Sequence, residues 1–134
     1  MSPVRAACAA ARQRTARAPI LARAMPQPTV CLILTTCANA DDALRLGRSL
    51  VDARLAACAS ALPPMTSVYR WQGQVEQASE VQLVVKTSGA RQAEAMAHIR
   101  THHPYEVPEI LVLPVNDGLP AYLAWVADNT LKDC

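Results

Sequence analysis

The sequence contains no phenylalanine, and its only aromatic residues are two tryptophans and three tyrosines. Its core must therefore be built from Ala, Val, Leu and Ile, which suits a chain that is 51% hydrophobic. The 134 residues fit one globular domain. Because a domain of this size leaves much of its apolar surface accessible, an oligomer that covers part of this surface is expected.

Long apolar runs and paired cysteine motifs are also absent. No run approaches the roughly 20 residues that a membrane helix needs, and no hydrophobic secretory segment is present, so we expect no membrane partner. The five cysteines are odd in number and form no C-x-x-C motif. These features predict reduced thiols and a cytoplasmic location.

Acidic residues are missing from the first part of the chain. Residues 1–25 carry five arginines and no acid, whereas residues 26–134 carry eight Lys and Arg against eleven Asp and Glu, or 8 − 11 = −3. We interpret residues 1–28 as a basic, disordered tail and residues 29–134 as the folded domain. An organelle transit peptide is the alternative for the tail, and it would change the location. Since the domain is mildly acidic, we expect no nucleic-acid partner.

The folded region begins with a strand and a helix. The string TVCLILTT, residues 29–36, fits a strand that is buried on both faces. Asn39 is predicted to cap the helix that follows. Two further strand signals flank a hairpin tip near residues 72–74, and Pro63 and Pro64 interrupt its first arm.

The second half of the domain repeats the alternation of helix and strand. Ser88 is predicted to cap a second helix on which His98 faces water. This helix ends before Pro104, which biases the preceding residue to extended geometry. EILVLPV, residues 109–115, is the fourth strand, and a third helix begins near Pro120.

The resulting order is β-α-β-β-α-β-α. It predicts an α+β, ferredoxin-like domain with an antiparallel four-stranded sheet, both main helices on one face and an additional C-terminal helix. The other face of the sheet is left for the third helix or another subunit to cover.

Four strings in this order resemble the CutA family of divalent-cation tolerance proteins: LVDARLAACAS, SVYRWQGQVEQASEVQLVVKT, HHPYEVPEILVLPV and YLAWV. The resemblance begins at Thr29 and extends through the last of these strings. It implies a homotrimer with clefts between chains and a role in the response to, or tolerance of, divalent metal ions such as copper. It also implies metal binding rather than turnover, so we expect no enzymatic activity and no organic cofactor.

The resemblance also suggests metal ligands. Copper-binding members are thought to use the two histidines of the H-H-P-Y segment, which match His102 and His103, with a cysteine at the end of the first strand. Counting back from Cys58 places that cysteine position on Thr35, and Cys37 follows two residues later. Thiolate and imidazole are donors that suit copper and zinc. We predict Cys37, His102 and His103 as metal ligands.

Two arguments weigh against this site. Adjacent histidines tend to point in different directions, so a third donor is required. A histidine at a helix C-terminus also interacts favourably with the last carbonyl groups, without any metal.

The other candidate residues support different functions. Lys86, Tyr105, Glu106 and Glu109 are predicted to line a cleft between subunits, where a PII-like sensor would bind a small molecule. Trp71, at the hairpin tip, is predicted to lie in a subunit interface. A thiol-dependent enzyme that uses Cys37 with His102 or His103 is the third alternative, although no nucleophile motif, phosphate loop or Rossmann glycine pattern supports it.

Overall fold

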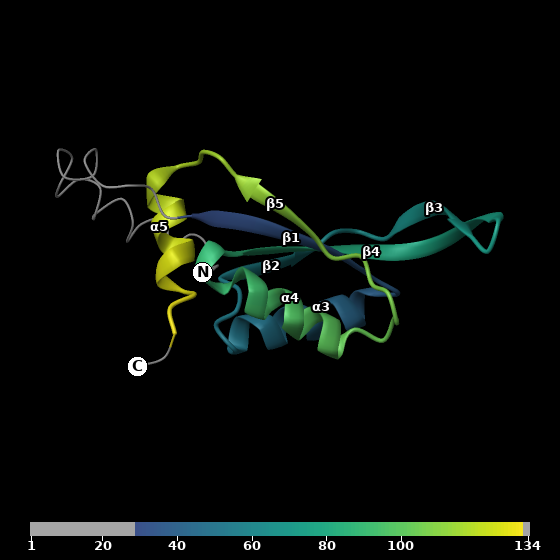
Figure 1. Ribbon diagram of the computed structural model, residues 1–134, viewed down its shortest axis with the longest axis horizontal. Coiled ribbons are helices and arrows are strands. Elements are labelled where there is room, and N and C mark those ends of the chain that lie inside the picture. The colour runs from purple at the N-terminus through teal and green to yellow at the C-terminus, as the bar shows by residue number, and fades with distance from the viewer. Residues whose placement is uncertain (1–28, 133–134) are drawn as a thin grey trace.

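The computed structural model of this chain describes residues 29–132, in which two helices cover one face of an antiparallel sheet (Figure 1). The tail predicted for residues 1–28 lies outside the described residues. The elements are β1 (Val30–Cys37), α3 (Ala40–Asp52), β2 (Cys58–Ala61), β3 (Met65–Trp71), β4 (Gln74–Ser88), the 3-10 helix η1 (Gly89–Arg91), α4 (Gln92–His102), β5 (Leu111–Val115) and α5 (Pro120–Asp128).

The strand order confirms the ferredoxin-like α+β fold. The sheet runs β2-β4-β1-β5, and β3 also pairs with β4. β2 pairs with residues 83–86 of β4 and β3 with residues 74–80, so two short strands share one long neighbour. Pro63 and Pro64 lie between the two short strands, because proline lacks the N–H group that would continue the ladder.

The hairpin formed by β3 and β4 projects beyond the helices (Figure 1). Its turn contains Gln72 and Gly73, both with positive φ, at 49° and 81°. Positive φ at both central residues is the geometry of a type I′ turn, which matches the twist of the flanking strands. Trp71 precedes this turn and is 61% exposed in the single chain.

The core lies between the sheet and the helices α3 and α4. Alternate residues of β4 are buried, namely Val81, Leu83 and Val85, and they pack in one cluster with Ile33 of β1. The helices contribute small and aliphatic side chains, as the lack of phenylalanine requires: Ala43, Leu46, Leu50, Ala95 and Ile99.

The opposite face of the sheet is only partly covered. At one end, Leu123 and Val126 of α5 pack against Val30. Farther along, Leu111 and Leu113 of β5 are exposed. The single chain therefore leaves apolar sheet surface open on the side away from α3 and α4.

Two local predictions about helix ends are confirmed. Asn39 caps α3 by accepting a hydrogen bond from the Asp42 N–H at 2.8 Å. The helix α4 ends at His102, and His103 already has extended backbone geometry before Pro104. The last strand begins at Leu111, two residues later than the strand predicted from Glu109.

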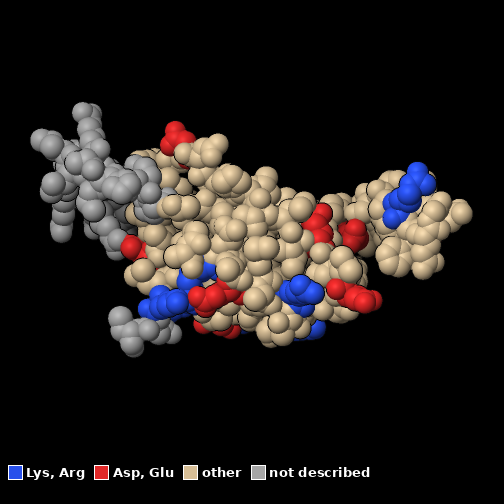
Figure 2. All heavy atoms as spheres, in the orientation of Figure 1, with Lys and Arg blue, Asp and Glu red and all other residues tan. Residues whose placement is uncertain are grey.

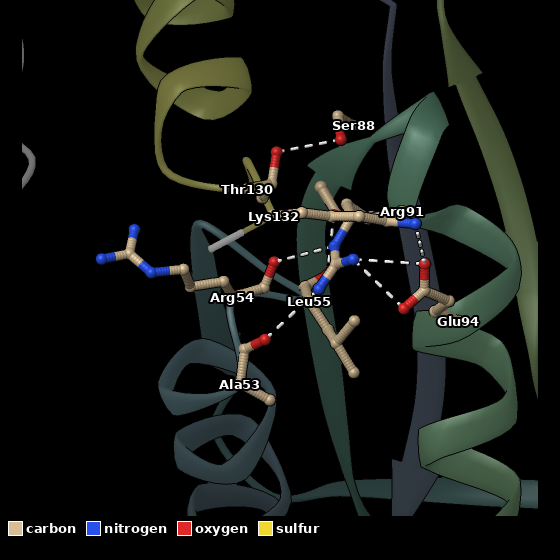
Figure 3. Close-up of polar contacts among 9 residues, drawn as sticks. Ala53, Arg54, Leu55, Ser88, Arg91, Glu94, Thr130 and Lys132 are labelled. Atoms are coloured by element: carbon tan, nitrogen blue, oxygen red, sulfur yellow. Dashed lines mark hydrogen bonds and ion pairs between the residues drawn. The ribbon is translucent and has the colours of Figure 1, made fainter. Parts of the chain in front are cut away.

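The prediction that Ser88 caps the second helix is wrong. Its side chain makes no cap hydrogen bond, because its hydroxyl instead accepts from Thr130 Oγ1 at 2.9 Å (Figure 3). The polypeptide enters α4 through η1, and Arg91 precedes the first residue of the helix. Ser88 therefore ties the segment after α5 to the end of β4.

Arg91 connects the end of α3 to the start of α4 (Figure 3). Its buried guanidinium donates to the carbonyl oxygens of Arg54 at 3.3 Å and Ala53 at 3.4 Å, and forms an ion pair with Glu94 at 3.1 Å. A cation at the C-terminal end of a helix satisfies carbonyl groups that lack partners within the helix. Arg91 thus holds the two main helices in register at one end of the sheet.

Charged side chains are mixed on the surface. On the face seen in Figure 2, Lys and Arg lie among Asp and Glu along the helical layer, without a broad patch of one sign. Within residues 29–132, no helix has the length and apolar character needed to cross a membrane.

Candidate functional site

A groove between α3 and the end of α4 brings the three predicted metal ligands to one region. Its volume is about 290 Å³. Cys37, His102 and His103 all line it, with Asp42, Arg45, Leu46, Ser49 and Pro104. The end of β1 supplies the thiol and the end of α4 supplies the imidazoles, so the fold joins segments that are 65 residues apart between Cys37 and His102.

The thiol of Cys37 lies in an environment that favours its protonated form. The residue is 3% exposed. Burial, together with the carboxylates of Asp42 and Glu80, raises the pKa of this thiol above its usual range. An ion that bound Cys37 would have to displace a proton held by both effects.

His103 is buried, and both nitrogens of its ring are already used. Nδ1 accepts a hydrogen bond from the Tyr105 N–H at 3.1 Å, so this nitrogen carries no proton. Nε2 lies 2.7 Å from the Thr36 carbonyl oxygen, which can only accept, so Nε2 carries the proton. His103 therefore links β1 to the loop after α4 and offers no free lone pair in this conformation.

His102 has the opposite environment, although it is adjacent. It is exposed, and its Nδ1 donates to the carbonyl oxygen of His98, one turn earlier, at 2.8 Å. In the neutral ring, Nε2 is then the nitrogen with a free lone pair. Of the two histidines in the H-H-P-Y segment, only His102 presents a nitrogen to an ion from solution.

His98 is half-buried against α3 rather than fully exposed to water, contrary to the prediction. Its Nε2 lies 2.9 Å from the hydroxyl oxygen of Ser49 on α3, and its ring stacks on that of His102 with centroids 4.1 Å apart. Burial and the neighbouring His102 lower the pKa of His98. This side chain is therefore part of the contact between α3 and α4.

Thr35 occupies the position at which the resemblance places a ligand cysteine. It is fully buried, and its hydroxyl has no hydrogen-bond partner. Across residues 29–132, no three side chains of His, Cys, Asp or Glu lie close enough together to hold a metal ion. The set of Cys37, His102 and His103 does not fit an ion in this conformation, and as a ligand set it stays a prediction.

The four residues predicted to line a cleft between subunits are spread over the chain. Lys86 lies on the open face of the sheet, with its Nζ 3.5 Å from Ser60 Oγ. Lys86 pairs with Leu32 of β1. Leu32 is five residues from Cys37, which is about 16 Å along the strand. Glu109 accepts a hydrogen bond from Gln82 at 3.1 Å, whereas Glu106 is exposed. Within one chain Lys86 does not approach the groove, and the convergence of these residues between chains stays a prediction.

Tyr105 lies beside the groove, next to His103. The two rings are tilted against each other, with centroids 4.7 Å apart. Burial and the nearby carboxylate of Glu80 raise the pKa of the Tyr105 phenol, and Cys37, Tyr69 and Asp42 add to this effect. The loop after α4 thus packs its aromatic residue close to the end of β1.

Sequence reasoning missed Ser49 and His98. Ser49 lies in the predicted first helix, and nothing in its neighbours distinguishes it from an exposed helical serine. His98 carried a signal, because His98 and His102 are four residues apart and therefore share one face of a helix. Ser49 and His98 meet only because α3 and α4 lie side by side on the sheet.

Comparisons with known proteins agree with this fold. The family described as CutA1 divalent ion tolerance protein matches residues 31–129. The divalent-cation tolerance protein CutA of Pectobacterium atrosepticum is 42% identical over 102 residues, which are 75% of this chain and 93% of that protein.

Two solved structures are similar in the same region. The crystal structure of CutA from Xylella fastidiosa has a TM-score of 0.73 and 40% identity, and the match covers 75% of this chain and 97% of that one. The divalent cation tolerance protein of Thermus thermophilus has a TM-score of 0.73 and 39% identity, with 75% and 98% covered. The resemblance seen in the sequence strings is confirmed: the chain belongs to the CutA1 divalent ion tolerance family.

Proposed function

We propose that this protein acts in divalent metal-ion tolerance by binding a soft or borderline divalent cation, with copper as the first candidate. The observation that carries the proposal is His102, whose Nε2 is unpaired and exposed at a groove that also contains a thiol and a carboxylate. Imidazole nitrogen suits copper and zinc, and divalent affinity generally peaks at Cu(II). The relatives named for divalent-cation tolerance support the same class of ion.

The proposed action is binding rather than turnover. A nucleophilic cysteine requires a lowered pKa or an adjacent base with a free lone pair. Burial and two carboxylates raise the pKa of Cys37, and the ring of His103 is fully engaged in hydrogen bonds. The raised pKa disfavours Cys37 as a nucleophile, and the hydrogen bonds of His103 disfavour that ring as its base. Neither feature affects the binding of an ion at His102.

The proposed form is a homotrimer in the cytoplasm. Exposed apolar side chains lie on the open sheet face and on the projecting hairpin, where another subunit would cover them: Val68, Trp71, Val75, Leu111 and Leu113. Interface cores are enriched in aromatic residues, which supports the proposed place of Trp71. The described cysteines Cys31, Cys37 and Cys58 are free thiols, as a reducing compartment favours.

Calorimetric titration with Cu(II) and Zn(II) tests this function. The wild-type protein is expected to bind Cu(II) with a defined stoichiometry, and His102→Ala combined with His103→Ala is expected to abolish binding. The absence of saturable binding to the wild-type protein, or unchanged binding in the double variant, would contradict the proposal. Circular dichroism of the double variant checks that the fold persists.

A further inference from the structure

The two histidines of the H-H-P-Y segment cannot act as equal ligands in the observed conformation. His103 accepts from Tyr105 through one nitrogen and donates to Thr36 through the other. Binding an ion would break one of these bonds and leave a buried polar group without a partner, which is unfavourable. A second donor for the ion at His102 must therefore be sought elsewhere.

The nearest imidazole to His102 is that of His98, one turn earlier on the same face of α4. The two ring centroids are 4.1 Å apart, with the ring planes inclined by 25°. Pairs of histidines four residues apart on a helix form a known type of two-point metal chelate. Spacing alone would be weak support, and the hydrogen bonds of the two rings add a second observation.

These hydrogen bonds leave one free nitrogen on each ring. The Ser49 hydroxyl donates to the Leu46 carbonyl oxygen at 2.8 Å, so its oxygen accepts from His98 Nε2. The free lone pair of His98 is therefore on Nδ1, and that of His102 is on Nε2. Metal-binding histidines almost always donate their other N–H to a protein oxygen or water, as both rings do here.

We propose that His98 and His102 together form the divalent-metal chelate of this chain, with Cu(II) as the preferred ion, and that His103 supports the fold. This inference rests on the proposed function and replaces His103 and Cys37 as ligands. Within residues 29–132, no three side chains of His, Cys, Asp or Glu lie close enough together to hold an ion, so the proposed chelate has two ligands from this chain and water in its remaining positions. Two imidazoles and water suit a tetragonal Cu(II) ion, to which such donors bind well.

The rings must move before they can share one ion. The lone pairs lie in the ring planes, and two nearly parallel planes that are stacked on each other do not bring both lone pairs to one ion. His102 is the ring that can turn, because it is exposed at the last residue of α4 and its hydrogen bond is to its own helix. The ring of His98 stays held by Ser49 across the helix contact.

The test compares Cu(II) binding by the wild-type protein and four variants, His98→Gln, His102→Gln, His103→Gln and Cys37→Ser. Glutamine can still donate to Ser49 but is a poor ligand for copper. His98→Gln and His102→Gln are each expected to weaken binding more than about 100-fold, beyond the loss expected for an outer partner of a ligand. Cys37→Ser and His103→Gln are expected to bind within a few fold of the wild-type protein.

A spectroscopic readout keeps the test valid if His103→Gln fails to fold. Zn(II) added to wild-type protein with ¹⁵N-labelled histidine is expected to shift Nδ1 of His98 and Nε2 of His102, and to leave both nitrogens of His103 unchanged. If His98→Gln binds Cu(II) as tightly as the wild-type protein does, the chelate is wrong and the proposed function remains intact. If the wild-type protein binds neither Cu(II) nor Zn(II), both the chelate and the proposed function are wrong.

Discussion

His102 is the last residue of α4, and His103 is the first residue beyond it. The change from helical to extended backbone between them sends one ring to solvent and the other into the contact with β1. The sequence supports the expectation that adjacent histidines diverge. Which of the two remains free for an ion depends on the position of the Thr36 carbonyl group, which lies 67 residues away in sequence.

At the residue scale, the environment of Cys37 predicts how the reactivity of its thiol depends on pH. Since burial and the carboxylates of Asp42 and Glu80 raise its pKa, the reactive thiolate is scarcer at neutral pH than in a free cysteine. Alkylation of Cys37 by iodoacetamide is expected to be slower than that of free cysteine at neutral pH, and to accelerate only as the pH rises beyond about 8.5, where an ordinary thiol ionises. Peptide mapping by mass spectrometry measures each cysteine separately.

The half-buried Cys58 serves as an internal control and is expected to react faster. Asp42→Asn removes one negative charge near the Cys37 thiol and is expected to move its reactivity toward neutral pH. Alkylation of Cys37 faster than that of free cysteine would favour the thiol-dependent enzyme instead.

At the scale of elements, polar side chains hold α3 and α4 together, and the apolar periodicity of the two helices does not identify them. Ser49, in the last turn of α3, contacts His98 of α4, and Arg91 joins the end of α3 to the start of α4. Arg91 was not selected from the sequence, because an arginine near a predicted helix start is normally exposed. Its burial follows from the end of α3, where the carbonyl oxygens of Ala53 and Arg54 accept hydrogen bonds from its guanidinium.

Arg91→Lys is expected to destabilise the protein. A single ammonium group cannot span two carbonyl oxygens and a carboxylate as the planar guanidinium does. We expect a loss of about 1–3 kcal/mol in the free energy of unfolding, measured by urea denaturation at one fixed protein concentration. The matched control is Arg100→Lys, on the exposed surface of α4, with an expected change within about 0.5 kcal/mol. Equal effects of the two substitutions would show that the Arg91 contacts do not stabilise the fold.

At the scale of the whole molecule, the open sheet face is the main unexplained feature of the single chain. Its exposed apolar residues on β5 contrast with the closed core on the other side. The hairpin of β3 and β4 extends past the helices and makes no core of its own (Figure 1). Both features are expected of a subunit that is completed by other copies of itself.

The proposed trimer predicts a mass of 3 × 14.4 = 43.2 kDa in light scattering. Leu113→Glu places a charge on the open sheet face and is expected to lower that mass, because an unpaired charge in an interface is costly. Val51→Glu on α3 is the matched control, since Val51 is 40% exposed and Leu113 41%. The control is expected to keep the wild-type mass. A wild-type monomer at micromolar concentration would contradict the trimer.

The sequence by itself determined the ferredoxin-like class, the family and the alternation of strands and helices. Each of these depends on local properties, namely apolar periodicity, the Asn39 cap, the proline breaks and the H-H-P-Y string. The predicted four strands are five in the structure, because Pro63 and Pro64 divide the predicted second strand into β2 and β3. The same local rules failed at Ser88 and His98, because both side chains are held by partners distant in sequence, Thr130 and Ser49.

Only the tertiary structure decided the chemistry of the candidate site. It showed that Thr35 is buried without a hydrogen-bond partner, that the ring of His103 is fully engaged, and that one nitrogen of His102 remains free. The availability of a ring nitrogen depends on which oxygen lies within hydrogen-bonding distance, and that depends on how β1, α3 and α4 pack. Residue types and spacing name the possible donors, whereas packing decides which of them can bind.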